Sequence, residues 1–405
     1  MKVLQVNAVN KVASTGRTCS ELSKYLTEHG DICVTAYSKG ISVDANAEYI
    51  IGNAFDIKLH GLFSRISGKQ AYFSKRETEK LLRFIKEYSP DIVILRNLHG
   101  NYINMPRLLS FLAENDIATV AVLHDCWFFT GKCCYYTSDR CYKWQTECRD
   151  CPSLKKDNKS WFFDRSTEMF RDKERLFNSI PRLAVVGVSQ WLTNEAKKSP
   201  IFKNAQEIIK IYNWIDTEVF KPVDTASLRA ELGLGDKKMI LAAASGWSHR
   251  KGLGTIIEIS KKLSDNERIV MVGNLNADVT LPDKIISMPS TNSVEDLVRY
   301  YSAADVLLQP SLEETFGKVT AEAISCGTPV VCFDSTATPE LVGEGCGAVV
   351  PVNDTEKMFS ELKTVLSNGK SVYSEKCRDF AVQNFNMEIN ISQYYALFQR
   401  LINKQ

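Results

Sequence analysis

The segment that decides the fold of this chain is Gln309-Pro310-Ser311-Leu312-Glu313-Glu314-Thr315-Phe316-Gly317-Lys318-Val319-Thr320-Ala321-Glu322-Ala323. It begins at the end of the apolar stretch 306–309, which is typical of a buried strand, and leads into a helix predicted over 316–326. Open parallel sheets bind ligands at the carboxyl ends of such strands. The helix start offers unpaired backbone N–H groups and a partial positive charge, which suit a diphosphate, and Gly317 lets the backbone approach closely.

Two carboxylates flank this helix start. Glu314 precedes the predicted helix, and Glu322 lies two turns into it. Placed in this way, one carboxylate can bind hydroxyl groups of a sugar while the other binds a ribose. The alternative interpretation of the same two residues is that Glu314 caps the helix and Glu322 is an ordinary surface charge.

The alternation of apolar strands and amphipathic helices extends over the whole chain and predicts an α/β fold of two doubly wound domains. Asn292 and Ser293 are expected to open one helix. The link between the domains is expected near 190–220. The predicted strands cover residues 2–8, 32–37, 91–95, 119–123, 182–188, 238–244, 268–273, 306–309 and 329–333, and the predicted helices 18–26, 81–88, 167–178, 254–263, 293–303, 316–326, 355–366 and 375–385.

Composition excludes several classes of protein. The 405 residues are 44% hydrophobic and 24% charged, which is ordinary for a folded protein of about two domains. No apolar run reaches the length of about 18 residues that a membrane-spanning helix needs, and the start has no signal-peptide pattern. We therefore expect a cytoplasmic protein. Residues 1–200 carry 29 Lys and Arg against 22 Asp and Glu, whereas residues 201–405 carry 21 against 26, so the two halves differ in charge.

Common nucleotide-binding signatures are missing from the sequence. There is no G-x-G-x-x-G dinucleotide fingerprint and no G-x-x-x-x-G-K-[ST] phosphate loop. No two aspartates are separated by a single residue, so the D-x-D pattern with which many nucleotide-sugar enzymes hold a divalent ion is missing too.

At this point the sequence resembles the retaining GT-B glycosyltransferases of glycosyltransferase family 4. The family pairs two glutamates eight positions apart with a helix that ends in Gly-x-Pro-Val, and Glu314, Glu322, Gly327, Pro329 and Val330 match that pattern. Further landmarks resemble the family in order along nearly the whole chain: Ser14-Thr15-Gly16-Arg17, Pro90-Asp91-Ile92-Val93, Leu123-His124-Asp125, Val188-Ser189-Gln190-Trp191-Leu192, Asn213-Trp214-Ile215-Asp216 and Lys251-Gly252.

The resemblance implies a GT-B fold, in which two Rossmann-like domains face a central cleft. The acceptor-side domain is expected at residues 1–195, with a Cys-rich insert at 126–151, joined by a C-terminal helix at about 386–405. The donor-binding domain is expected at 196–385.

The resemblance also implies roles for individual residues. Glu314 binds hydroxyls of the transferred sugar, Glu322 binds the ribose, and Lys251 holds the diphosphate together with backbone N–H groups. His124 lies against the sugar. The catalytic candidates are His124, Glu314 and Lys251, and the donor-binding candidates are Gly16, Arg17, Gly246, Arg250, Lys251, Glu314, Thr315, Phe316, Gly317 and Glu322.

Two positions depart from the family pattern. The family usually has an arginine where this chain has Gly246, so Arg250 would have to supply the second positive charge. Trp214 replaces a usual glycine. His99 follows another predicted strand and is a further candidate for acceptor contact.

The implied activity is the retaining transfer of a hexose or N-acetylhexosamine from a UDP- or GDP-sugar to a glycan, without a catalytic metal. The acceptor is expected to be lipid-linked, in the assembly of a bacterial surface polysaccharide such as capsule or lipopolysaccharide, with peripheral association at the cytoplasmic membrane face. No nucleic-acid partner is expected. The alternatives are a zinc-containing nucleic-acid-binding protein, suggested by the cysteines and the basic first half, and a scaffold that has lost catalysis.

Six of the twelve cysteines lie within residues 126–151. The pair Cys148-x2-Cys151 has the spacing of a thiolate zinc site, and Cys133 and Cys141 complete four ligands. Cys126 and Cys134 remain spare. A structural zinc ion is the favoured interpretation, and free buried thiols and disulfides stay open as alternatives.

Overall fold

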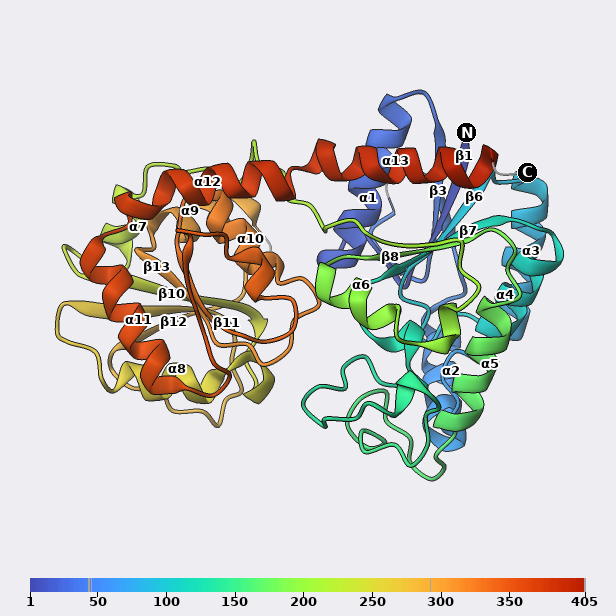
Figure 1. Ribbon diagram of the computed structural model, residues 1–405, viewed down its shortest axis with the longest axis horizontal. Helices are drawn as coiled ribbons and strands as arrows, with labels where there is room; N and C mark the ends of the chain where they lie inside the picture. Colours follow the sequence, from blue (N-terminus) through green and yellow to red (C-terminus); the bar gives the residue numbers. More distant parts are fainter. Residues whose placement is uncertain (43, 45, 292, 404–405) are drawn as a thin grey trace. The chain divides into compact units, whose positions relative to one another are not determined.

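The computed structural model describes the whole chain apart from residues 43, 45, 292, 404 and 405. Contacts divide the chain into two compact units (Figure 1). The first unit contains Met1–Ile211 and Ile391–Gln405, and the second contains Tyr212–Asn390. Among the described residues, no helix is both long and apolar enough to cross a lipid bilayer.

The first unit is built on a parallel sheet of seven strands in the order β5-β3-β1-β6-β7-β8-β9. Its central strands are buried along nearly their whole length, as expected for a parallel sheet covered on both faces. The strands are β1 (Lys2–Val6), β3 (Ile32–Tyr37), β5 (Glu48–Ile50), β6 (Ile92–Leu95), β7 (Ala118–Leu123), β8 (Leu183–Gly187) and β9 (Glu207–Lys210), and β2 (Val9–Asn10) pairs separately with β4 (Lys39–Gly40).

Helices lie on both sides of this sheet (Figure 1). The helices of this unit are α1 (Ala13–Glu28), α2 (Ala54–Ser67), α3 (Lys75–Tyr88), α4 (Met105–Glu114), α5 (Ser166–Phe177) and α6 (Gln190–Ala196). The last helix, α13 (Met387–Asn403), belongs to this unit from Ile391 onward. Its Arg400 guanidinium lies 2.9 Å from the Glu207 carboxylate on β9, which attaches the end of the chain to the edge of the sheet.

The second unit repeats the architecture with six parallel strands in the order β12-β11-β10-β13-β14-β15. One apolar core packs the sheet against α8 and α11, and includes Ile240, Ile256, Val331 and Leu362. The strands are β10 (Lys238–Gly246), β11 (Glu267–Asn274), β12 (Ile285–Met288), β13 (Val306–Gln309), β14 (Val330–Phe333) and β15 (Gly347–Val350), and the helices are α7 (Ala226–Glu231), α8 (Leu253–Ser260), α9 (Val294–Ala303), α10 (Lys318–Ser325), α11 (Thr355–Asn368) and α12 (Ser371–Phe385).

The predicted α/β class with two doubly wound, Rossmann-like parts is confirmed. Ser293 caps α9 as expected, because its hydroxyl oxygen accepts the backbone N–H of Asp296 at 3.1 Å, whereas Asn292 lies outside the described residues. The first unit continues past residue 195, the boundary drawn from the sequence, because β9 pairs with β8 along Ala184–Gly187.

Two local predictions are wrong. Gly16 and Arg17 lie inside α1, which begins at Ala13 rather than at the predicted residue 18. Phe316 and Gly317 precede α10 instead of opening it, because Gly317 adopts a left-handed backbone with φ of 92° and serves as the N-cap. Neither helix start has a side-chain cap, so the usual sequence signal for a helix N-terminus is missing at both.

Candidate active site

The second unit has its topological switch point between β10 and β13. The strand order runs outward from these two strands, to β11 and β12 on one side and to β14 and β15 on the other. In open α/β sheets, ligands bind in the crevice formed at the carboxyl ends of strands at such a point. The segment that follows β10 contains His249–Lys251, and the segment that follows β13 contains Glu314–Gly317. Both predicted donor-binding stretches therefore leave adjacent strands on the same edge of one sheet.

Backbone contacts hold these two segments together. The N–H of Leu312 donates to the carbonyl oxygen of Arg250 at 2.9 Å. Gly252 has a φ of 75°, and a Cβ atom at that position would lie 2.2 Å from the carbonyl oxygen of Pro310. Only glycine permits this approach. Glycine is therefore required directly after Lys251 for a steric reason. Gly252 allows the segment that carries Lys251 to lie against the segment that carries Glu314.

The two side chains of opposite charge meet at this point. Lys251 Nζ lies 2.5 Å from Glu314 Oε1, and their side chains are 22% and 11% exposed. Gln309 Nε2 also donates to Glu314 Oε1, at 3.4 Å, and the backbone N–H of Glu314 donates to Thr336 Oγ1 at 2.8 Å. Hydrogen bonds therefore hold both the side chain and the backbone of Glu314 in place. A group that orients a ligand needs to be held in this way.

The start of α10 supplies the next part of the site. No acidic residue lies in its first turn. The first N–H groups of a helix lack partners within the helix and carry a partial positive charge. Thr315 and Phe316 lead into this turn, and the Phe316 ring packs against Tyr212 and Phe385 with centroid distances of 6.1 and 5.6 Å. The aromatic packing fixes the backbone at the position where a diphosphate is expected.

Glu322 lies inside α10 and is only 3% exposed. The hydroxyl of Tyr301, on α9, donates to Glu322 Oε2 at 2.8 Å. Glu314 is 8% exposed. The alternative in which Glu322 is a surface charge is therefore wrong, since burying a carboxylate is costly unless hydrogen bonds stabilise it. Tyr301 was not among the predicted site residues, because its contact with Glu322 arises only from the packing of α9 on α10.

Gly246 and Arg250 lie on either side of the turn after β10. Gly246 is the last residue of that strand, paired with Asn274 of β11. Arg250 lies in the short 3-10 turn His249–Lys251, and its carbonyl oxygen makes the backbone contact with Leu312. Both residues precede Lys251, Gly246 at the end of the strand and Arg250 in the turn that carries Lys251.

In the first unit, His124 follows β7 and contacts a residue that the sequence interpretation missed. Arg96 Nη1 lies 2.9 Å from His124 Nε2, and Arg96 Nε donates to Gln5 Oε1 at 3.2 Å. Because a guanidinium only donates hydrogen bonds, His124 Nε2 accepts, and the ring carries its proton on Nδ1. Arg96 is fully buried at the end of β6, the strand next to β7. The position of Arg96 directly after a buried strand is the feature of the sequence that could have revealed this contact.

A second histidine pairs with the residue next to His124. His99 Nε2 lies 2.8 Å from Asp125 Oδ2, and Asp125 Oδ1 accepts the backbone N–H of Trp127 at 2.8 Å. Burial alone lowers the pKa of His99, but the Asp125 carboxylate outweighs burial and raises it. Burial raises the pKa of Asp125, and the adjacent His99 outweighs this and lowers it. His99 and Asp125 thus form a hydrogen-bonded pair at the carboxyl ends of β6 and β7.

Gly16 and Arg17 lie near neither of these pairs in the contacts that the structure gives. A Cβ atom on Gly16 would lie 3.0 Å from the backbone nitrogen of Lys11, and the N–H of Lys11 donates to the Gly16 carbonyl oxygen at 3.1 Å. Gly16 therefore has a packing role at the start of α1, and its assignment to donor binding remains a prediction.

Four of the six clustered cysteines line one cavity. These are the four predicted zinc ligands, Cys133, Cys141, Cys148 and Cys151. Cys126 and Cys134, the two predicted to be spare, are not among the residues that line it.

Comparison with known proteins identifies the second unit. Residues 224–384 match the family described as glycosyl transferases group 1. Among curated proteins, the D-inositol 3-phosphate glycosyltransferase of Mycobacterium sp. (strain KMS) is 29% identical over 215 residues, covering 47% of this chain and 49% of that protein. The N-acetyl-alpha-D-glucosaminyl L-malate synthase of Bacillus anthracis is 24% identical over 228 residues, covering 53% and 58%. The match thus spans about half the length of these relatives.

Solved structures show the fold of the whole chain. Sucrose-phosphate synthase from Thermosynechococcus elongatus superposes with a TM-score of 0.73 at 15% identity, covering 100% of both chains. The Anabaena protein HepE in complex with UDP superposes with a TM-score of 0.68 at 16% identity, covering 99% of this chain and 100% of HepE. The chain therefore has the fold of the GT-B glycosyltransferases, and its residues 224–384 match the glycosyl transferases group 1 family.

Proposed function

We propose that this protein is a retaining glycosyltransferase that moves a hexose or N-acetylhexosamine from a UDP- or GDP-sugar to a glycan acceptor. The observation that carries the proposal is the Lys251–Glu314 pair at the switch point of the second unit, directly before the N-terminus of α10. A cation such as Lys251 beside the start of a helix suits a diphosphate. A fixed carboxylate such as Glu314 next to that cation suits the hydroxyls of the sugar attached to the diphosphate.

In this proposal the second unit binds the donor. Lys251, assisted by Arg250 after the strand end at Gly246, and the N–H groups around Thr315, Phe316 and Gly317 hold the diphosphate. Negative charge develops on this leaving group in the transition state, and a fixed ammonium and a helix dipole stabilise it without a catalytic metal ion. Glu314 orients the transferred sugar.

Glu322, supported by Tyr301, binds the ribose of the nucleotide. A UDP or GDP donor is in keeping with HepE, whose structures were solved with UDP and with UDP-glucose. The likeness to those structures rests on the fold alone, so the base of the nucleotide is left to experiment.

The first unit contributes His124, held by Arg96 in its Nδ1-protonated form, which can donate a hydrogen bond to the donor sugar. Gly16 and Arg17, inside α1, remain assigned to the donor phosphates and the acceptor. His99 and Asp125 are proposed to contact acceptor hydroxyls. The acceptor oxygen attacks the anomeric carbon on the face that the diphosphate leaves, and its proton passes to the departing phosphate, so configuration is retained.

A lipid-linked acceptor and peripheral membrane association, in the assembly of a surface polysaccharide, form the finer part of the proposal. Support comes from α2, which buries Ile57 together with His60, Gly61 and Ser64 and exposes an apolar stripe. The stripe consists of Phe55 (71% exposed), Leu59, Leu62, Phe63 and Ile66. Exposed apolar residues in one contiguous row are typical of a surface that contacts a partner or a membrane interface.

Aromatic and basic residues extend this surface. Trp161, Phe162 and Phe163 are exposed on a loop whose Trp161 N–H donates to the Arg65 carbonyl oxygen on α2 at 2.7 Å. A cavity of about 520 Å³ beside α2 is lined by Arg65, Lys156 and Lys159 together with amide and hydroxyl side chains. None of the described residues that line it is acidic. Apolar and cationic groups side by side fit an anionic lipid surface.

Thermal unfolding in the presence of UDP, GDP and ADP tests the donor site. We expect one or two of these nucleotides to raise the midpoint temperature of unfolding, because a ligand that binds only the folded state stabilises that state. No shift with any of them would contradict donor binding and favour a scaffold. Hydrolysis of UDP- and GDP-sugars by the same protein would then identify the sugar.

A further inference from the structure

The segment between β7 and α5 is unusual for its lack of regular structure. Within residues 124–165, all of which are described, the regular elements are the two short 3-10 turns Trp127–Phe129 and Lys143–Gln145. Loops longer than about 15 residues without helices or strands are uncommon in compact domains. Trp144 and Tyr136 are nevertheless buried, with exposed fractions of 1% and 2%. Something other than backbone pairing must hold this segment in one shape.

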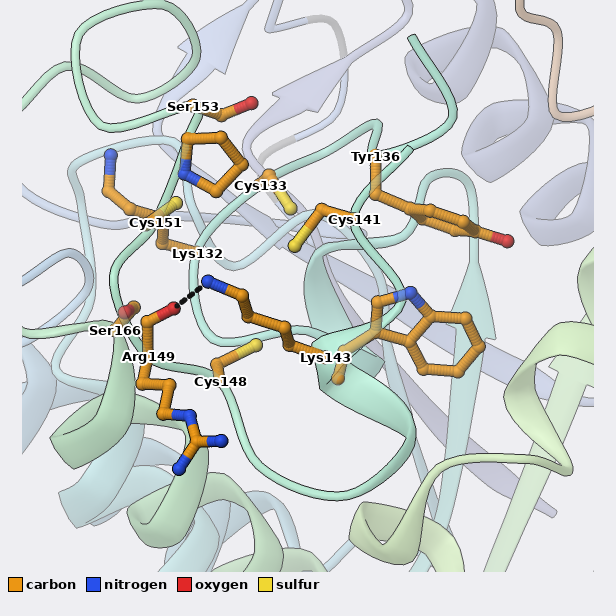
Figure 2. A pocket seen from close by; sticks show the side chains of 12 residues that line it. Lys132, Cys133, Tyr136, Cys141, Lys143, Cys148, Arg149, Cys151, Ser153 and Ser166 are labelled. Carbon is orange, nitrogen blue, oxygen red and sulfur yellow. Dashed lines mark hydrogen bonds between the residues drawn. The ribbon is translucent and has the colours of Figure 1, made fainter. Parts of the chain in front are cut away.

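Four cysteines line a small cavity within it. Figure 2 shows Cys133, Cys141, Cys148 and Cys151 around this cavity, with the side chain of Lys143 among them. The cavity has a volume of about 10 Å³. That is room for one water-sized sphere, hence for a single ion but not for an iron–sulfur cluster.

Hydrogen bonds orient the turns that carry these cysteines. The Gly131 N–H donates to Cys148 Sγ at 3.2 Å, and the Cys151 N–H donates to Asp164 Oδ2 at 2.7 Å. Gly131 is obligatory, because a Cβ atom there would lie 2.5 Å from the Ser166 carbonyl oxygen and 2.9 Å from Cys148 Cβ. The first contact orients a ligand sulfur and stabilises negative charge on it, whereas the second fixes the backbone of the turn that carries Cys151.

Two buried lysines give an independent indication of negative charge in the segment. Lys173 is fully buried, and its Nζ donates to the carbonyl oxygens of Trp127 at 2.5 Å and Thr130 at 2.9 Å. Lys132 is 1% exposed, and its Nζ donates to the carbonyl oxygens of Asp157 and Asn158. The hydrogen bonds given for these two ammonium groups all go to backbone carbonyl oxygens. A buried cation is costly unless a counter-charge lies nearby.

We propose that Cys133, Cys141, Cys148 and Cys151 bind one structural zinc ion. Four thiolates and one Zn²⁺ carry a net charge of about −2, which the ammonium groups of Lys132 and Lys173 offset. Zinc prefers four sulfur ligands in a tetrahedron at about 2.3 Å, a geometry that suits neither Mg²⁺ nor Ca²⁺. The claim does not depend on the proposed glycosyl transfer, since metal content is measured without substrate.

Binding requires the four sulfur atoms to draw together. Among the described residues, the group with three ligand atoms within 4.8 Å of one another is His99, Asp125 and Cys134. That group already has hydrogen-bonded partners, because His99 pairs with Asp125 and Asn158 Nδ2 donates to Cys134 Sγ at 3.3 Å. The cavity cysteines lie on turns outside helices and strands, so no ladder of backbone hydrogen bonds holds them apart.

The test is the metal content of the full chain, purified under reducing conditions and without added metal. Elemental analysis is expected to find about one zinc per chain, and replacement with Co²⁺ should produce sulfur-to-cobalt charge-transfer bands and the strong visible bands of tetrahedral cobalt. Zinc below half an equivalent that added Zn²⁺ does not restore, or iron in its place, would overturn the proposal. So would disulfides among these cysteines in protein alkylated before reduction.

Replacing single cysteines by serine tests which of them bind the zinc ion. Cys148→Ser and Cys141→Ser are expected to lose most of the zinc, whereas the matched controls Cys126→Ser and Cys134→Ser, in the same segment but outside the cavity, should keep it. Should a ligand variant fail to fold, the cobalt spectrum of the unaltered chain still decides the matter. Zinc retained by both ligand variants, or lost equally in the controls, would contradict the assignment.

Discussion

Lys251 Nζ lies 2.5 Å from Glu314 Oε1, so the cation expected to hold the donor diphosphate is paired with the carboxylate expected to hold the donor sugar. The two residues stand 63 positions apart, on segments that leave adjacent strands. In the proposed site, a bound diphosphate would share Lys251 with Glu314. We therefore expect the pair to link recognition of the two halves of the donor.

Replacing Glu314 by Gln should affect the rate of sugar transfer and the binding of the nucleoside diphosphate differently. The transfer rate is expected to fall by about 100-fold or more, since a fixed charged group at the reacting sugar is lost. Binding of the nucleoside diphosphate should stay the same or tighten, because the negative charge beside Lys251 is removed. Turnover and calorimetric binding measure the two effects. Glu344→Gln, an exposed carboxylate in the same unit, is the control, and unchanged turnover of E314Q would refute the assignment.

Replacing Glu322 by Ala should weaken nucleotide binding by about 10- to 100-fold, the effect of losing hydrogen bonds to a charged group. Tyr301→Phe removes one hydrogen bond to the same carboxylate and should cost less, about 1 kcal/mol. Calorimetry with a nucleotide lacking the ribose hydroxyls provides the control. The Glu322→Ala effect should largely disappear with that nucleotide, and an equal loss with both ligands would show that Glu322 acts on the fold instead.

Acid is expected to destabilise the first unit through His60. Burial lowers the pKa of His60 from 6.5 to about 4, and its Nδ1 lies 2.7 Å from Ser74 Oγ. Between pH 6.5 and 4 the unfolded chain takes up a proton that the folded chain does not, so the unfolding free energy falls as pH falls, by at most about 3 kcal/mol. Below pH 4 this loss levels off, because the folded state then binds the proton too.

Denaturant unfolding as a function of pH measures this effect. His60→Asn keeps a polar partner for Ser74 and should flatten the dependence between pH 6.5 and 4. The control His29→Asn replaces an exposed histidine and should leave this pH dependence as in the unaltered chain. Equal pH dependence of the unaltered protein and H60N would rule out His60 as the cause.

The apolar stripe of α2 should bind anionic membranes. Replacing Phe55 and Phe63 together by Ser is expected to weaken binding to phosphatidylglycerol vesicles at least tenfold, because each buried phenyl ring contributes about 1.5–3 kcal/mol. Arg65→Gln with Lys159→Gln should instead reduce the dependence of binding on salt. Cosedimentation measures both. Val372→Ser, an exposed apolar residue of the second unit, is the control, and equal binding of all variants would exclude α2 as the contact surface.

Periodicity in the sequence predicted most strands and helices of the two sheets, because buried parallel strands read as short apolar runs. It assigns no element to residues 54–67, where α2 forms. The reason is that α2 buries one large apolar residue, Ile57, beside His60, Gly61 and Ser64, and exposes its other large apolar residues, unlike an ordinary surface helix. The Asn53 and Asp56 capping box was the local signal that could have revealed it.

By itself, the sequence determined the α/β architecture, the candidate carboxylates Glu314 and Glu322, and the four cysteines that line one cavity. These features depend on residue type and short-range spacing. Only the tertiary structure decided that Lys251 meets Glu314, that Tyr301 supports Glu322 and that Arg96 fixes the tautomer of His124. Each of these pairs joins residues on different elements, and strand order and helix packing, rather than local sequence, bring them together.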